Sequence, residues 1–296
     1  MEAGATRLSR LRFPAVSEET FRRLAWVALA ALFLIVVTGA TVRLTDSGLG
    51  CENWPRCGTT FLPQKGYHAY IEFGNRVVGV LVGVSTLLAA VAAWRAGVSR
   101  RLAWAATALP LLVLAQGILG GITVIFELHP LIVMGHFLLS LVALAVAVAV
   151  VAGAHGGAGR AAGDVGWLAL ALLPATLVLV VTGTLVTAAG PHSGGTDIRR
   201  FGNLVDAVHV HVGAVAAFGV GFLGLLAALL ARRERARVEL VLAGAVLAVL
   251  LAQVAVGEIQ WRERLPWGLV LAHVALATSV WMGMVALAVR LAPRRT

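Results

Sequence analysis

Histidines in the apolar stretches of the sequence are the residues best suited to carry chemistry. They are His68, His136, His209, His211 and His273, and each lies near the beginning of a long apolar segment. An ionisable side chain inside such a segment is costly and marks a functional site by default. Imidazole is a good ligand for iron, and two facing helices with one inward histidine each can supply both axial ligands of a heme. The sequence therefore predicts heme-binding sites, although a single histidine can instead make an ordinary hydrogen bond between helices.

Three of these histidines share one depth. His136, His211 and His273 lie five to seven residues from the beginnings of their segments, which is roughly 8 to 10 Å along a helix. His209 points about 200° away from His211 on the same helix, so the two cannot face the same way. We expect His211 to be the ligand because of its depth, with His209 as the alternative. The remaining histidines, which fall between the segments, are expected to be solvated: His129, His155 and His192.

A carboxylate accompanies the first histidine. His68, Glu72 and Asn75 are spaced i, i+4 and i+7, which places them in one stripe on one helix face. Glu72 can form an ion pair with Arg76, four residues later. It can also accept a proton from a bound substrate. We favour the second role, because a carboxylate in an apolar segment has a cost that a catalytic use explains.

The two cysteines, Cys51 and Cys57, lie in one loop that also contains glycine and proline. Cysteines this close in sequence can close a small disulfide only in an oxidising compartment. The loop is therefore predicted to lie outside the cytosol. A purely structural staple and a redox role are equally open for the pair.

Composition defines the elements that must position these residues. The chain of 296 residues is 59% apolar and 13% charged, with a mean hydropathy of +0.90, which excludes an ordinary soluble domain and predicts an all-α integral membrane protein. A spanning helix needs about 20 mostly apolar residues. Eight segments qualify: 23–44, 68–94, 102–126, 131–153, 166–188, 204–231, 238–259 and 267–291.

Basic residues give the orientation. The net charge of +10 is concentrated in short clusters at the ends of the apolar segments, so it orients the chain in a lipid bilayer and does not indicate nucleic acid. One side collects sixteen Lys and Arg residues and the other eight. By the positive-inside rule, both termini are cytoplasmic and the cysteine loop is outside.

An internal repeat divides the chain. Residues 37–42 (VTGATV) recur as 181–186 (VTGTLV), and residues 114–116 (LAQ) recur as 251–253 at the offset of 137 residues that also separates His136 from His273. The chain is thus predicted to be two parallel four-helix bundles related by a pseudo-twofold axis along the membrane normal. The boundaries are a cytoplasmic tail 1–22, a first unit 23–153 with the cysteine loop 45–67, a linker 154–165, a second unit 166–291 and a tail 292–296.

These residues resemble the heme A synthase family of bacterial cytochrome oxidase assembly. The resemblance covers nearly the whole chain and rests on Thr38-Gly39 through Arg43, on the run 47–51 (SGLGC), on Trp54-Pro55 and on Cys57. It implies an enzyme of the bacterial plasma membrane that oxidises the C8 methyl group of heme O to a formyl group by successive hydroxylation. The implied partners are heme O synthase, other oxidase assembly factors and, in an oligomer, a second copy of the chain.

The resemblance also assigns roles to individual residues. It implies a heme B cofactor with iron between His211 and His273, and a substrate heme O in the first unit at His136 and the 68–94 helix, where His68, Asn75 and Arg76 contribute. Glu72 matches the family's catalytic carboxylate. Cys51 and Cys57 match a pair that can form a disulfide in the outer loop.

Asn75 departs from the family pattern. Many members carry a histidine three residues after the glutamate, and this chain carries asparagine, as does an actinobacterial-type subgroup. Either His68 replaces the missing ligand, or His136 alone binds the substrate iron and leaves a position open to water. Two other functions are alternatives: a diheme electron carrier of the cytochrome b type, which requires two symmetric histidine pairs, and a transporter of heme or another small molecule.

Overall fold

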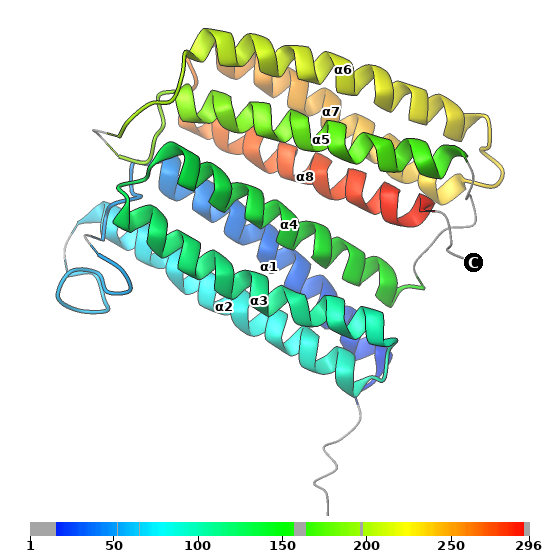
Figure 1. The fold of residues 1–296 in the computed structure, drawn as a ribbon, viewed down its shortest axis with the longest axis horizontal. Coiled ribbons are helices and arrows are strands. Elements are labelled where there is room, and N and C mark those ends of the chain that lie inside the picture. Colours follow the sequence, from blue (N-terminus) through cyan, green and yellow to red (C-terminus); the bar gives the residue numbers. More distant parts are fainter. Residues whose placement is uncertain (1–15, 52, 65, 157–163, 196–197, 293–296) are drawn as a thin grey trace, which may run out of the picture.

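The computed structural model describes residues 16–51, 53–64, 66–156, 164–195 and 198–292. In this part of the chain, eight helices are long and apolar enough to cross a membrane (Figure 1). They are α1 (Glu18–Leu44), α2 (Tyr67–Arg95), α3 (Arg100–Ile125), α4 (Pro130–Ala154), α5 (Asp164–Ala189), α6 (Leu204–Leu230), α7 (Arg237–Arg262) and α8 (Trp267–Leu291). The predicted all-helical membrane fold is confirmed.

The helix ends follow local polar chemistry more than hydropathy. Helix α1 begins five residues before the predicted segment 23–44, because the Ser17 side chain accepts the Thr20 N–H at 3.1 Å and two acids occupy the first turn. Capping and the helix dipole both favour these residue types at this end. Helix α6 begins where Asn203 accepts the N–H groups of Val205 and Asp206. The apolar run missed the polar first turn of α1, but it predicted the start of α6 at residue 204 correctly.

The helices form two groups with the same internal pairing. In the first group α1 packs on α2 and α4, and α3 packs on α2 and α4; in the second, α5 packs on α6 and α8, and α7 packs on α8. The groups lie side by side and meet mainly through α4 and α8 (Figure 1). One difference stands out: α6 and α7 touch far less than α2 and α3 do. The pseudo-twofold axis and the unit boundaries stay predictions, and this pairing is what they would produce.

Each group has a packed core at the end away from the cysteine loop. The first core runs along α4 from Leu141 to Val151, and the second runs along α6 from Phe218 to Leu229. At the boundary, the Trp281 indole N–H of α8 donates to the Leu141 carbonyl of α4 at 2.9 Å. Both cores therefore stop short of the level of the predicted heme ligands.

A polar seam joins the groups at the loop end. Arg43 of α1 donates from Nε to the His192 carbonyl at 2.9 Å and from Nη2 to the Thr187 carbonyl at 2.8 Å. The Gly48 N–H donates to the Gly194 carbonyl, also at 2.9 Å. From the sequence, Arg43 is one of the outer basic residues and the last residue of the family motif, with no partner assigned. Its two hydrogen bonds link the first group of helices to the second.

Two loop histidines correct the expectation that they are solvated. His192 is half-buried, and its Nε2 lies 2.7 Å from the Leu265 carbonyl. His129 is also half-buried, and its Nδ1 is inaccessible and has no hydrogen-bond partner among the described residues. Only His155 is exposed as expected. The connections at the loop end pack on one another, which a reading of loops as solvated segments does not anticipate.

Several predictions concern parts of the chain outside the described residues. They include most of the tail 1–22, most of the linker 154–165, and most of the tail 292–296. Several basic residues of the charge count also lie there: Arg7, Arg10, Arg12, Lys65, Arg160, Arg294 and Arg295. The cytoplasmic placement of both termini therefore stays a prediction.

Candidate functional site

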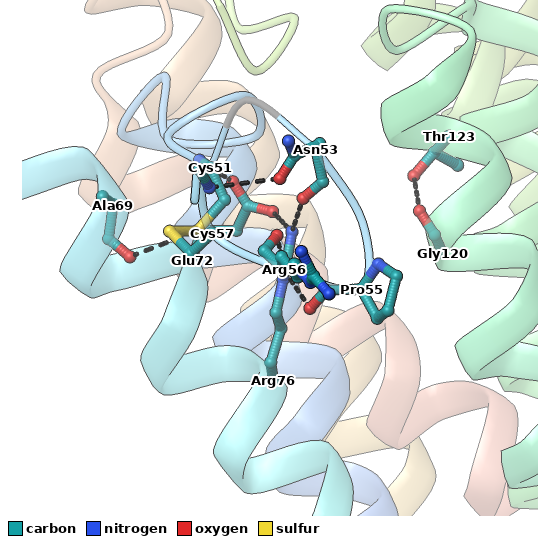
Figure 2. Close-up of polar contacts among 11 residues, drawn as sticks. Cys51, Asn53, Pro55, Arg56, Cys57, Ala69, Glu72, Arg76, Gly120 and Thr123 are labelled. Carbon is teal, nitrogen blue, oxygen red and sulfur yellow. Dashed lines mark hydrogen bonds and ion pairs between the residues drawn. A yellow bond between two sulfur atoms is a disulfide. The ribbon is translucent and has the colours of Figure 1, made fainter. Parts of the chain in front are cut away.

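A disulfide closes the cysteine loop against helix α2. Cys51 and Cys57 are bonded to each other, and the Cys51 backbone N–H donates to Glu72 Oε2 at 2.8 Å. The other carboxylate oxygen, Oε1, accepts from Arg76 Nη2 at 2.5 Å. Figure 2 shows Glu72 held between the loop and Arg76. Glu72 is only 5% exposed, so its buried carboxylate depends on the Cys51 N–H and the Arg76 guanidinium for its stabilisation.

Arg76 holds the loop as well as the carboxylate. Its guanidinium donates to the backbone carbonyls of Asn53, Pro55 and Arg56 at 3.1 to 3.3 Å (Figure 2). The ion pair of Glu72 with Arg76 and the predicted role of Glu72 as a proton acceptor are therefore compatible, since the ion pair exists and also orients the carboxylate. The role of Arg76 in binding the substrate heme, which the resemblance implies, stays a prediction.

The same loop reaches helix α3 above His136. A Cβ added at Gly121 would lie 2.7 Å from the Trp54 ring, and a Cβ at the neighbouring Gly120 would lie 3.4 Å from Cε1 of His136. Both glycines thus allow a ring to approach the α3 backbone, one from the loop and one from α4. Glu72 and His136 consequently lie beneath one and the same loop.

Gly50 sets how closely the loop approaches α2. A Cβ at this position would lie 2.5 Å from the carbonyl carbon and oxygen of His68, and the backbone of a helix cannot move aside as a side chain can. We expect Gly50→Ala to displace the loop and destabilise the protein by about 1 to 3 kcal/mol. A fluorescence thermal-shift measurement in detergent would record a lower unfolding midpoint. A separate measurement of thiol release with a reductant would record faster reduction of the disulfide.

The control for that substitution is Gly79→Ala, on α2, the helix that Gly50 approaches. A Cβ at Gly79 has nothing within 4 Å, and alanine favours a helix over glycine. This variant should match or exceed the stability of the parent chain. Equal midpoints for the two variants would contradict the close approach at Gly50.

His136 and His273 occupy matching positions in the two halves. Both are half-buried. A Cβ at Gly257 of α7 would lie 3.0 Å from Cε1 of His273, as Gly120 of α3 does for His136. The Nδ1 atoms of both rings are buried without a hydrogen-bond partner among the described residues; the Gln253 carbonyl lies near His273 but does not complete a bond. The two histidines thus have the same surroundings, each packed against a glycine of the preceding helix with its Nδ1 buried.

His211 faces the interior of the second half, and His209 does not. His211 is half-buried and its Nδ1 lies 3.0 Å from the Thr182 hydroxyl, which leaves Nε2 available. His211 and His273 lie within electrostatic range of each other. His209 is exposed. The burial of these side chains favours His211 over His209, as the depth argument did.

Asn75 occupies the place of His211 in the first half. The Thr38 hydroxyl donates to Asn75 Oδ1 at 2.7 Å, and Thr38 and Thr182 are the same residue of the repeated Thr-Gly pair. In this register Glu72 and Arg76 correspond to Val208 and Val212. The first half thus has a carboxylate and an arginine where the second half is apolar.

His68 lies apart from this stripe of interior contacts. Its side chain is exposed, and its Nδ1 lies 2.9 Å from the hydroxyl of the fully buried Ser47. Sequence reasoning missed Ser47 as a partner of His68 and the two threonines as partners of Asn75 and His211. The repeated Thr-Gly motif was the signal for the threonines, but from the sequence alone it served only as evidence of duplication and of the family resemblance.

The donor sets suit a heme in each half. Among the described residues, no group of three or more His, Cys, Asp or Glu side chains could hold a bare metal ion. The half-buried imidazoles of the helices are instead one in the first half, His136, and two in the second, His211 and His273, and a porphyrin, which supplies four iron ligands of its own, requires one or two. The glycines that face the rings and the cores that end below them are compatible with a flat cofactor at this level.

Comparisons with known proteins agree with this architecture. A family model described as cytochrome oxidase assembly protein matches residues 22–68 and 62–285. A heme A synthase of Lysinibacillus sphaericus is 35% identical over 130 residues, 42% of this chain and 42% of that protein. One of Symbiobacterium thermophilum is 40% identical over 116 residues, 38% of this chain and 37% of that protein.

A relative with another name matches a shorter region. A protoheme IX farnesyltransferase of Halobacterium salinarum is 32% identical over 96 residues, 32% of this chain and 21% of that protein. The chain thus spans about two fifths or less of the length of these curated relatives.

Proposed function

This chain belongs to the family of cytochrome oxidase assembly proteins, and from that membership we propose that it converts heme O to heme A. The reaction oxidises the C8 methyl group of heme O to a formyl group by successive hydroxylation. Support comes from the relatives named heme A synthase at 35% and 40% identity.

One observation carries the proposal: among the described residues, a buried carboxylate and a half-buried imidazole lie near the same loop in the first of two similar halves, and the second half has no such pair. Glu72 and His136 form this set, and the register places Val208 at the position of Glu72 in the other half. An electron carrier of the cytochrome b type needs no carboxylate and would use two equal heme sites. The asymmetry therefore favours an enzyme with one reacting half and one supporting half.

The residues then divide the work as follows. His136 binds and positions the substrate heme, and Glu72 accepts protons released as the methyl group is oxidised. Arg76 and the Cys51 N–H hold Glu72 in place, and the disulfide loop excludes water from above. His211 and His273 hold heme B. Heme B, when bound, supplies one-electron transfer.

The proposed setting is the plasma membrane of a bacterium, with both termini in the cytoplasm. Heme O is made by a farnesyl transfer to heme, and the match to a protein named protoheme IX farnesyltransferase supports an association with that preceding step. Oxidase assembly factors and a second copy of this chain are further proposed partners.

Extraction of hemes from the purified full-length protein tests the function. The protein is expressed with and without a heme O synthase, and the extracted hemes are separated by chromatography. Heme A or its hydroxylated intermediate should appear only when heme O is supplied. Heme B alone in both preparations would contradict the proposed reaction.

A further inference from the structure

The two halves carry different side chains at one equivalent position, which is Asn75 in the first half and His211 in the second. In the second half, the Thr182 hydroxyl contacts His211 Nδ1 at 3.0 Å. In the first half, the Thr38 hydroxyl contacts Asn75 Oδ1 at 2.7 Å. Each half also has a histidine that packs against a glycine of the preceding helix: His136 against Gly120, and His273 against Gly257. An imidazole pair in one half therefore corresponds to an imidazole and a carboxamide in the other.

His68 does not replace the missing imidazole. It lies seven residues before Asn75, about two helical turns or 10 Å along α2, and its side chain is exposed. Its Nδ1 contacts Ser47, in the part of the loop that is fixed to the other half through Gly48. Gly50 also packs directly against the His68 backbone, so α2 cannot slide to bring His68 to the level of His136 without displacing the loop.

The carboxamide of Asn75 is oriented by its neighbour. The Thr38 hydroxyl donates to Oδ1, so the amide N–H₂ is the end left to act as a donor. An amide nitrogen has no lone pair suited to iron, but it can donate a hydrogen bond to a small molecule that is bound there. Glu72, three residues earlier on the same face, supplies a second polar group on this side.

We infer that the first half binds its heme iron through His136 alone, and that Asn75 forms the polar wall of an open position on the opposite face that accepts a small ligand such as CO or cyanide. This inference rests on the proposed function, because it takes the substrate heme to lie at His136. It distinguishes the halves by ligand access: the second half is closed by His211 and the first half is open.

The test uses the full-length protein purified with its hemes and reduced with dithionite. We expect CO to bind to one heme per chain, and a high-spin signal beside a low-spin one in the ferric protein. Asn75→His should abolish the high-spin signal and reduce CO binding at least tenfold, because the new imidazole can adopt the threonine contact that His211 makes. The reciprocal His211→Asn should open the second half and raise CO binding toward two per chain.

Two more variants distinguish a side chain that binds the iron from one that only lines the open position. Asn75→Leu should still bind CO, with the C–O stretching band at higher wavenumber because the amide donor is lost. His68→Ala should leave the spin state and CO binding unchanged. A conversion from low spin to high spin in His68→Ala would overturn the inference by identifying His68 as the second ligand.

Heme content distinguishes the failure of this inference from the failure of the proposed function. Two hemes per chain, both low-spin and both unreactive with CO, would contradict the single-histidine site and leave the reaction intact. A chain that binds heme only in the second half, with no change in heme content in His136→Ala, would contradict the substrate site and therefore the proposed function itself.

Discussion

Replacing Glu72 with glutamine should abolish heme A formation while both hemes remain bound. Glutamine keeps the size of the side chain and an oxygen that can accept from the Cys51 N–H. Its amide N–H₂ then replaces the oxygen that accepted from Arg76, but Arg76 keeps its three bonds to loop carbonyls, so the loop should stay in place. Glutamine cannot accept a proton, and loss of a positioned proton acceptor costs about 100-fold or more in rate. Chromatography of extracted hemes measures the product, and the absorption spectrum measures heme content.

The chain offers a matched control for this substitution. Glu239 of α7 is also a buried carboxylate, 4% exposed, and accepts from Arg290 of α8 at 2.9 Å, but it lies at the opposite end of the bundle. Glu239→Gln should retain heme A formation even if it lowers stability. If both variants lost activity in proportion to their stability, Glu72 would be a structural residue and not a proton acceptor.

Removal of His273 should empty the second half of its heme. His273 is half-buried, and its Nδ1 has no hydrogen-bond partner among the described residues, so removal of the ring breaks no hydrogen bond that the structure shows. His273→Gly should therefore lose most of the heme B and all detectable heme A formation, with the fold retained. Added imidazole should restore heme binding in this variant, an effect that the loss of a merely structural side chain would not show.

Helix α6 provides a second comparison within the same half. His211→Ala should lose heme B as His273→Gly does, whereas His209→Ala should keep it, because His209 is exposed. Heme content by the pyridine hemochrome spectrum decides between them. Loss of heme B in His209→Ala together with retention in His211→Ala would reverse the assignment.

Much of the fold could be predicted because a membrane helix is encoded locally. Each of the eight spans is a continuous apolar run, and the structure places a helix on every one of them. The repeated residues His136 and His273 were likewise recognisable, because an offset shared with other residues is a property of the sequence alone. Their burial and their matching glycines agree with that pattern.

The contacts that hold the site could not be predicted in the same way. Arg43 finds its partners 144 and 149 residues later, and hydropathy gives no indication of such a pairing. Arg76 could be matched with Glu72 from spacing, but its three bonds to loop carbonyls depend on how the loop folds back. The hydrogen-bond partners of Arg43 and Arg76 thus depend on the tertiary structure, which residue type alone does not predict.

The indole of Trp281 makes the two halves unlike where they meet. The offset of 137 residues places Trp281 at the position of Leu144, and the Trp281 N–H bonds the Leu141 carbonyl across the boundary between α8 and α4. Two first halves could not form this bond, because leucine has no donor. The contact between the two groups of helices therefore includes a hydrogen bond that only the second group can donate, so the groups are not interchangeable at their interface.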